Sequence, residues 1–209
     1  MSRPIFMIVA GIMGSGKSSL IRSGVIHDVA REIKPFSGSL RIFNVDERAK
    51  LTRSFEGCVD NSWIEAVIEV ETLIDWHITA RKNIGFETVL GSDKYNQRVM
   101  AAVSNSFYTM MVYVSVESQD LAQKRVRSRL EEGGHGADFK SFDFFWNTSL
   151  ENFKWMFKTC DYTVIYDTTS YDADDGGYSV PIFAGNTSKS DIVPLRENVA
   201  FNQIKNLIM

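Results

Sequence analysis

A short glycine-rich segment near the N-terminus constrains the fold more than any other part of this 209-residue chain. Val9 to Ser19 reads Val-Ala-Gly-Ile-Met-Gly-Ser-Gly-Lys-Ser-Ser, which contains the G-x-x-x-x-G-K-[ST] pattern of a phosphate-binding P-loop. The apolar run Ile5 to Ala10 before it suits a buried parallel strand, and Ser18 to Lys34 after it suits a helix. Because backbone N–H groups and a helix N-terminus meet at such a turn, the segment predicts a nucleotide-phosphate site.

Each residue type in this loop matches a requirement of phosphate binding. Lys17 can reach the β- and γ-phosphates of a nucleotide, and the Ser18 hydroxyl can ligate Mg²⁺. Glycine positions lack a Cβ atom, so backbone amides can close around phosphate oxygens. A nucleoside triphosphate with Mg²⁺ is therefore the expected ligand. The predicted nucleotide-binding residues of the loop are Gly11, Gly14, Ser15, Gly16, Lys17, Ser18 and Ser19.

The composition is that of an ordinary soluble α/β domain. Apolar residues make up 44% of the chain, charged residues 23%, and the net charge is -3. With this net charge a strongly basic surface is not the default, although a local basic patch is still compatible with it, so nucleic acid is not an expected partner. No apolar run reaches membrane-spanning length. The two cysteines, Cys58 and Cys160, have no metal-ligand spacing and are interpreted as reduced thiols of a cytoplasmic protein.

Apolar strand-like runs alternate with helical segments along the chain. The predicted strands are Ile5 to Ala10, Leu40 to Val45, Ile84 to Leu90, Phe107 to Val116 and Tyr162 to Asp167. The predicted helices are Ser18 to Lys34, Asn61 to Lys82, the segment capped by Asp93 that runs to Ser104, Ser118 to Glu132, and Phe139 to Thr159. This alternation predicts one α/β domain over residues 1–209, with a parallel sheet of about five strands and helices on both faces. Residues 170–209 add a loop, a small strand at Val180 to Ala184 and a closing helix from Asn198.

Two acidic residues occur where strands are predicted. Asp46 ends the second strand, and parallel strands present functional side chains at their C-terminal ends, so it should face the same crevice as the P-loop. A carboxylate there suits a general base for an attacking hydroxyl, with a metal-shell carboxylate or a helix cap as alternatives. Glu87 lies inside the third strand, where a carboxylate needs either an ion-pair partner or a ligand.

A cluster of arginines stands directly before a glycine-rich segment. Arg125, Arg127 and Arg129 lie in the second half of a predicted helix, where the helix dipole alone would favour them. The glycines that follow suit a mobile lid with its hinge at 133–140. Phosphoryl transfer needs cations around the γ-phosphate and a positioned base, so this cluster, the P-loop and Asp46 together indicate a kinase.

Six short segments follow one another in an order typical of one family of P-loop proteins. They are the P-loop at Gly11 to Ser19, Phe-Asn-Val-Asp-Glu at Phe43 to Glu47, Gly-Phe-Glu-Thr-Val-Leu at Gly85 to Leu90, Arg125 and Arg129 leading to Gly133-Gly134-His135, Ser-Leu-Glu-Asn at Ser149 to Asn152, and Val-Ile-Tyr-Asp at Val164 to Asp167. Through them the chain resembles the zeta-toxin family and its zeta-like relatives, from Ile5 to Thr169. The segment after Ser170 is not covered by this resemblance.

The resemblance implies a small-molecule kinase with a nucleotide-kinase-like P-loop fold. Zeta toxins use ATP or GTP to phosphorylate a sugar hydroxyl of UDP-N-acetylglucosamine, and a similar effector branch phosphorylates a ribose hydroxyl of NAD. The implied partners are therefore a nucleotide-type small molecule and an antitoxin or other inhibitory protein; an effector would act after delivery into a target cell. Carried onto this chain, the resemblance implies that Lys17, Asp46 and Arg129 are catalytic, with Asp46 as the general base. It places Arg125 at the triphosphate. The implied acceptor-binding residues are Glu71, Glu87 and Thr88.

Two positions depart from the family pattern. Val89 stands where zeta toxins carry a threonine two positions after the strand glutamate, and Thr88 would point to the opposite face of an ideal strand. Phe145 stands where relatives carry an arginine ten residues after the lid histidine. These changes leave two alternatives open. One is a kinase of another small acceptor, such as an antibiotic or a nucleoside. The other is a nucleotide-binding regulatory or partner-binding module with little transfer activity.

Overall fold

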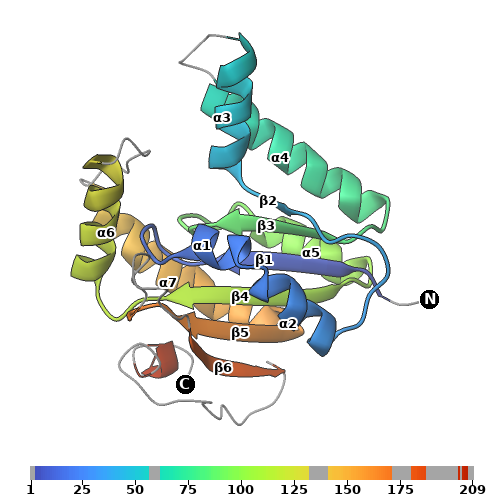
Figure 1. Cartoon of the computed structure of the whole chain (residues 1–209). Helices are drawn as coiled ribbons and strands as arrows, with labels where there is room; N and C mark the ends of the chain where they lie inside the picture. Colours follow the sequence, from blue (N-terminus) through green and yellow to red (C-terminus); the bar gives the residue numbers. More distant parts are fainter. Residues whose placement is uncertain are drawn as a thin grey trace.

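A sheet of six strands forms the centre of the molecule (Figure 1). The computed structural model describes residues 3–56, 62–131, 141–170, 180–186, 202 and 204–206. The strands lie in the order β2-β3-β1-β4-β5-β6, and all neighbours pair in parallel except β5 and β6, which are antiparallel. Their bounds are β1 Ile5–Ala10, β2 Ile42–Phe43, β3 Ile84–Thr88, β4 Tyr108–Ser115, β5 Tyr162–Asp167 and β6 Val180–Asn186.

The central strand β1 is buried on both faces, as its continuous apolar sequence predicts. All six of its side chains are fully inaccessible to solvent. Alternate residues enter two separate apolar clusters, with Phe6 and Ile8 on one face and Met7 and Val9 on the other. This division follows from the two-residue repeat of a strand and confirms the doubly covered parallel sheet.

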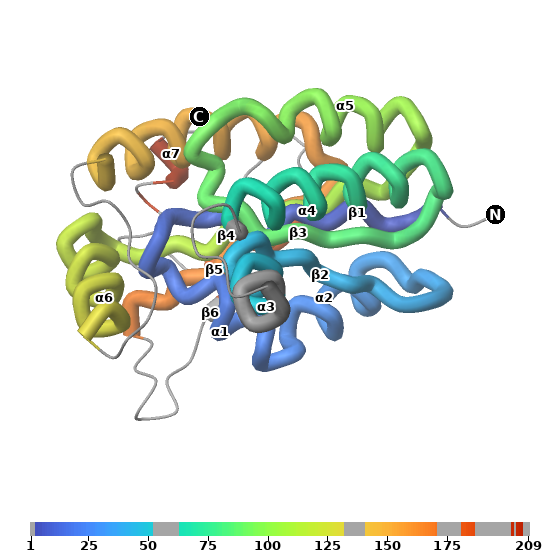
Figure 2. Tube along the Cα trace, turned by 90° about the horizontal axis from the view of Figure 1, so that it is seen from above, coloured from blue at the N-terminus to red at the C-terminus, as the bar shows by residue number. Residues whose placement is uncertain are grey.

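Helices cover both faces of this sheet (Figure 2). Their bounds are α1 Lys17–Arg22, α2 Val25–Ile33, α3 Val45–Glu56, α4 Ser62–Thr79, α5 Asn96–Ser104, α6 Gln119–Glu131 and α7 Phe142–Thr159. One face is covered by α1 and α2, and the other by α4, α5 and α7. Helix α6 stands beyond the carboxyl ends of the strands (Figure 1). None of the helices in the described ranges combines the length and apolar character needed to cross a membrane.

Three predicted elements differ in the structure. The helix predicted over Ser18 to Lys34 is broken into α1 and α2 at Gly24, whose φ of 81° is left-handed. The strand predicted over Leu40 to Val45 shrinks to β2, because α3 begins at Val45 and Asn44 caps it. Helix α5 has Tyr95 rather than Asp93 as its N-cap residue, although the Asp93 carbonyl accepts the N–H of Asn96.

Large aromatic side chains are exposed on helices α4 and α7. Trp63 is 53% exposed although it lies on the same face of α4 as the buried Val70 and Ile74, because the N-terminal end of α4 extends past the sheet (Figure 1). Phe144 of α7 is 62% exposed. Cys160 is buried, and burial raises the pKa of its thiol to about 12. Cys58, the lid hinge 133–140 and most of the closing helix lie outside the described residues.

Candidate functional site

The P-loop joins β1 to α1 through three glycines with positive φ angles. Gly14, with a φ of 80°, is tightly enclosed, since a Cβ atom there would lie 2.3 Å from the carbonyl oxygen of Ala122. The loop therefore touches the first turns of α6, the helix that carries the arginines. Only glycine combines this left-handed conformation with so close an approach of two backbones.

Alanine at Gly14 should destabilise the fold more than alanine at Gly24, which provides a matched control. The φ angles are 80° and 81°, but nothing lies within 4 Å of a Cβ at Gly24. Gly24→Ala should therefore cost only about 1–2 kcal/mol for the left-handed backbone. Gly14→Ala should cost about 1–3 kcal/mol more, because the backbone of α6 has to move. Urea unfolding of both variants measures the difference, and equal losses would contradict the close packing of the loop.

The Lys17 ammonium lies inside the P-loop. Its Nζ donates to the carbonyl oxygens of Gly11 at 2.8 Å and Ile12 at 3.0 Å, and Glu87 Oε1 lies 4.0 Å away. Burial is the main cause that lowers the pKa of Lys17. The carboxylates of Glu87 and Asp46 oppose this pKa shift, and the Arg129 guanidinium adds to it. Glu87, Asp46 and Arg129 are thus each close enough to act electrostatically on the Lys17 ammonium.

Glu87 lies against the P-loop because β3 pairs directly with β1, with Glu87 opposite Val9. The Ser18 hydroxyl is 3.2 Å from both Glu87 carboxylate oxygens, and the Asn44 amide donates to Oε2 at 2.5 Å. Glu87 therefore meets the hydroxyl predicted to ligate Mg²⁺. An acceptor contact by Glu87 stays a prediction.

Asp46 is the second residue of α3, not the last residue of a strand. Its side chain is exposed, and the positive end of the helix dipole favours a carboxylate at this position. The helix is capped by Asn44, whose Oδ1 accepts the N–H of Glu47 at 3.0 Å. The alternative role of Asp46 as the cap is therefore wrong.

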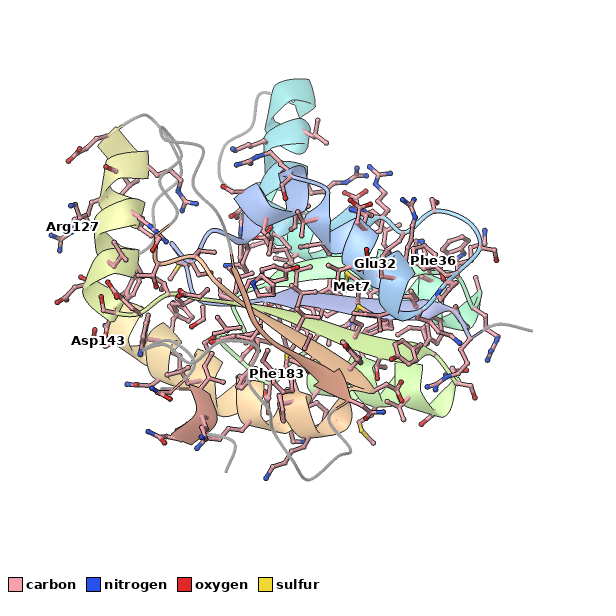
Figure 3. The ribbon with its side chains drawn as sticks, turned by 60° about the horizontal axis from the view of Figure 1, so that its bottom comes forward. Met7, Glu32, Phe36, Arg127, Asp143 and Phe183 are labelled. Carbon is pink, nitrogen blue, oxygen red and sulfur yellow. The ribbon has the colours of Figure 1, made fainter. Side chains whose placement is uncertain are left out.

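The three arginines of α6 have different surroundings. Arg125 donates to the carbonyl oxygens of Thr168 at 2.7 Å and Thr169 at 3.1 Å, so it ties α6 to the end of β5. Arg127 points outward from α6 (Figure 3). Arg129 lies in the last turn and is exposed. Of the three, Arg129 is the one that acts on Lys17.

Thr168 is a site residue that the sequence analysis missed. Its hydroxyl donates to the carbonyl oxygen of Ser15 at 2.7 Å, and its methyl group packs near Gly16. The same hydroxyl is 3.3 Å from Arg125. Thr168 therefore supports the P-loop from β5. Its only signal in the sequence is its position directly after a predicted strand.

The two remaining predicted acceptor residues are engaged by protein partners. Glu71 of α4 pairs with Lys94 at 3.1 Å and Arg98 at 3.4 Å, which joins α4 to the region where α5 begins. The Thr88 hydroxyl accepts the N–H of Leu90 at 3.1 Å. Ser19, predicted to bind nucleotide, lies 3.4 Å from the guanidinium of Arg22.

Phe145, at the position where relatives carry an arginine, is part of the apolar packing. A Cβ atom on Gly91 would lie 2.6 Å from its ring, and it packs on a cluster that includes Ile12, Val126 and Phe142. Phe145 of α7 therefore packs where α7 meets α6 and the P-loop. The position supplies packing and no positive charge.

The loop fits a triphosphate with Mg²⁺. The Ser15 hydroxyl is fully buried and has no hydrogen-bond partner among the described residues, so a polar atom is left for a ligand. Ser18 and Glu87 present oxygen ligands, which Mg²⁺ prefers. Lys17 and the glycine backbone provide positive charge and amide donors in the same place.

A mostly parallel sheet with this loop between β1 and α1 defines a fold of the P-loop kinase type. The zeta toxin family model matches residues 1–174, and the chain belongs to the zeta toxin family. The resemblance inferred from the six segments is therefore confirmed.

Solved structures agree with this fold. One is described as the PezAT chromosomal toxin-antitoxin system of Streptococcus pneumoniae, with a TM-score of 0.63, 16% identity, and coverage of 99% of this chain and 85% of that chain. Another is the AvrRxo1-ORF1:-ORF2 structure with ATP, with a TM-score of 0.66, 10% identity, and coverage of 99% of this chain but 64% of that one. At such identities the likeness concerns the fold.

A curated relative matches a smaller part of the chain. It is an uncharacterized protein of Haemophilus influenzae, 29% identical over 62 residues, which are 29% of this chain and 44% of that relative. The match therefore spans less than half of the relative's length.

Proposed function

We propose that this protein is an ATP-dependent kinase that phosphorylates a hydroxyl group of a nucleotide-type small molecule, with UDP-N-acetylglucosamine as the first candidate. One observation carries the proposal: Asn44, two residues before Asp46, donates to Glu87, and the Glu87 carboxylate lies 4.0 Å from the buried Lys17 ammonium, so the start of α3 lies beside the P-loop. A base for a hydroxyl and a cation for a phosphate thus share one site. Membership of the zeta toxin family supports the same reading.

The P-loop binds the triphosphate in this proposal. Lys17 and the loop amides hold phosphate oxygens, while Ser18 and Glu87 would hold Mg²⁺, directly or through water. When bound, the nucleotide supplies the phosphoryl group, and Mg²⁺ withdraws charge from it. Thr168 and Arg125 keep the loop in place through the Ser15 carbonyl and the end of β5.

Asp46 takes up the proton of the acceptor hydroxyl. Its exposure leaves room for an acceptor, and its place in the first turn of α3 holds it near Lys17. Arg129 of α6 adds positive charge near Lys17. This charge would stabilise the negative charge that develops on the phosphoryl group during transfer. Acceptor contacts by Glu71 and Thr88 stay predictions. Both side chains already contact other protein groups, so an acceptor would have to share or replace these contacts.

An acceptor panel tests the proposal. Wild type and Asp46→Asn are incubated with Mg²⁺ and γ-labelled ATP against UDP-N-acetylglucosamine, NAD, nucleosides and antibiotics, with GTP as competing donor. Label should enter one acceptor with the wild type alone. ATP binding without transfer to any acceptor would overturn the kinase proposal.

That second outcome would favour a nucleotide-binding regulatory or partner-binding module. The observation behind this alternative is Phe145, which packs where a relative would carry a transition-state cation. An antitoxin or inhibitory protein is the proposed partner, since the PezAT neighbour is described as part of a toxin-antitoxin system. Action in the cytoplasm belongs to the same proposal, because ATP and nucleotide-type acceptors occur there.

A further inference from the structure

Asn44 joins two parts of the site that are separate in the sequence. It lies between β2 and α3, one residue after Phe43 and two before Asp46. Its Oδ1 accepts the N–H of Glu47 at 3.0 Å, and its carbonyl oxygen accepts the N–H of Arg48 at 3.1 Å. Its Nδ2 donates to Glu87 Oε2 at 2.5 Å. One amide group therefore begins the helix and holds a carboxylate 43 positions away.

The two contacts specify the orientation of this amide. A backbone N–H can only donate, so it must face the oxygen, and an ionised carboxylate can only accept, so it must face the nitrogen. Both halves of the side chain are used. The Glu87 carboxylate is then held between the Asn44 amide and the Ser18 hydroxyl, 4.0 Å from Lys17.

We propose that Asn44 is a positioning residue that couples the start of α3, which carries Asp46, to the Glu87 carboxylate beside Ser18. The inference rests on the proposed function only for the roles of Asp46 and Ser18. Through one side chain, the acceptor side of the site is aligned with the phosphate side.

The other residues that cap helices well cannot do both tasks. Serine at position 44 would cap α3, but its hydroxyl is shorter and cannot replace the amide donor at Glu87. Aspartate would also cap α3, but it would set a second carboxylate against Glu87, and like charges at such a distance repel. Cap function and carboxylate positioning are therefore separable by substitution.

A reversed hydrogen bond tests the contact without nucleotide or activity. Asn44→Asp should lower the thermal unfolding midpoint of the free protein, while the double variant Asn44→Asp with Glu87→Gln should recover most of that loss. The double variant keeps the cap and restores a donor–acceptor pair with its polarity reversed. Equal midpoints for wild type and Asn44→Asp, or no recovery in the double variant, would overturn the coupling.

The positioning role is tested by the Mg²⁺ dependence of nucleotide binding. A fluorescent ATP analogue is titrated at rising Mg²⁺ concentration against wild type, Asn44→Ser and the control Glu47→Gln. Loss of a group that orients a metal-site carboxylate raises the half-saturating Mg²⁺ concentration by about 10-fold or more. Asn44→Ser should show this shift with a smaller fall in the thermal midpoint than Asn44→Asp, because the cap is kept and no second carboxylate faces Glu87. Glu47→Gln should show no shift in the Mg²⁺ dependence.

The two failures are distinguishable. A wild-type Mg²⁺ response in Asn44→Ser would mean that Asn44 is only a helix cap, whatever the acceptor panel shows. Absence of transfer to every acceptor, together with the Mg²⁺ shift, would leave the coupling standing and remove the kinase.

Discussion

Replacing Lys17 by methionine is expected to abolish measurable phosphoryl transfer, with a loss of at least about 10²–10³-fold from one missing preorganised charge. Methionine keeps much of the side-chain volume in the P-loop but has no ammonium to place on phosphate oxygens. ATP should also fail to raise the thermal unfolding midpoint of this variant, since nucleotide binding itself depends on the same group. Label transfer and nucleotide-induced thermal shift measure the two effects, and retained transfer would contradict the P-loop assignment.

The same variant has a predicted pH signature. Burial lowers the pKa of Lys17 in the folded state from its ordinary value of 10.5. Between the lowered pKa and 10.5 the unfolded chain binds more protons than the folded one, so the free energy of unfolding contributed by Lys17 rises with pH. Wild type should therefore gain stability relative to Lys17→Met as the pH is raised from neutral toward 10.5. Urea unfolding at both ends of this range measures the gain, and Lys158→Met, which removes an exposed ammonium, should not reproduce it.

Elements with one dominant local signal could be predicted closely from the sequence. β1 and β5 have their predicted bounds, because a strand buried on both faces needs a continuous apolar run. β2 could not be predicted in the same way, because its predicted segment Leu40 to Val45 includes Arg41 and Asn44. The Asn44 side chain captures the N–H of Glu47, and this local hydrogen bond starts a helix where the apolar pattern predicts more strand.

The site also contains residues that a local motif predicts and contacts that it does not predict. The roles expected for Lys17 and Ser18 follow from spacing within one loop, and the structure places both residues there. The contact of Glu87 with Ser18 joins positions 69 apart, and that of Thr168 with Ser15 joins positions 153 apart. Such pairings depend on strand order in the sheet, which no local pattern encodes. Asn44 belongs to the family segment Phe43 to Glu47. The sequence signal for its role as a helix cap is an asparagine that precedes two acidic residues.

Asparagine at Asp46 is expected to lower phosphoryl transfer by about 10²–10⁴-fold, the contribution of a positioned general base. The amide is nearly the same size as the carboxylate but does not take up the proton of an acceptor hydroxyl. ATP affinity should change little, because the loop amides, Lys17 and Ser18 are untouched. A steady-state assay on the acceptor found in the panel, together with titration of a fluorescent ATP analogue, separates transfer from binding.

Glu47→Gln is the matched control for this change. Glu47 lies beside Asp46 in the first turn of α3 and is likewise exposed, so either substitution removes one negative charge from the same helix N-terminus. Each should therefore cost a similar free energy of unfolding, about 0.3–1 kcal/mol from the helix dipole. Of these two acidic residues, Asp46 is the one that acts on the pKa of Lys17, so Asp46→Asn should lose transfer and Glu47→Gln should not. Equal losses in both variants would show that charge at the start of α3, and not proton transfer to Asp46, supports the reaction.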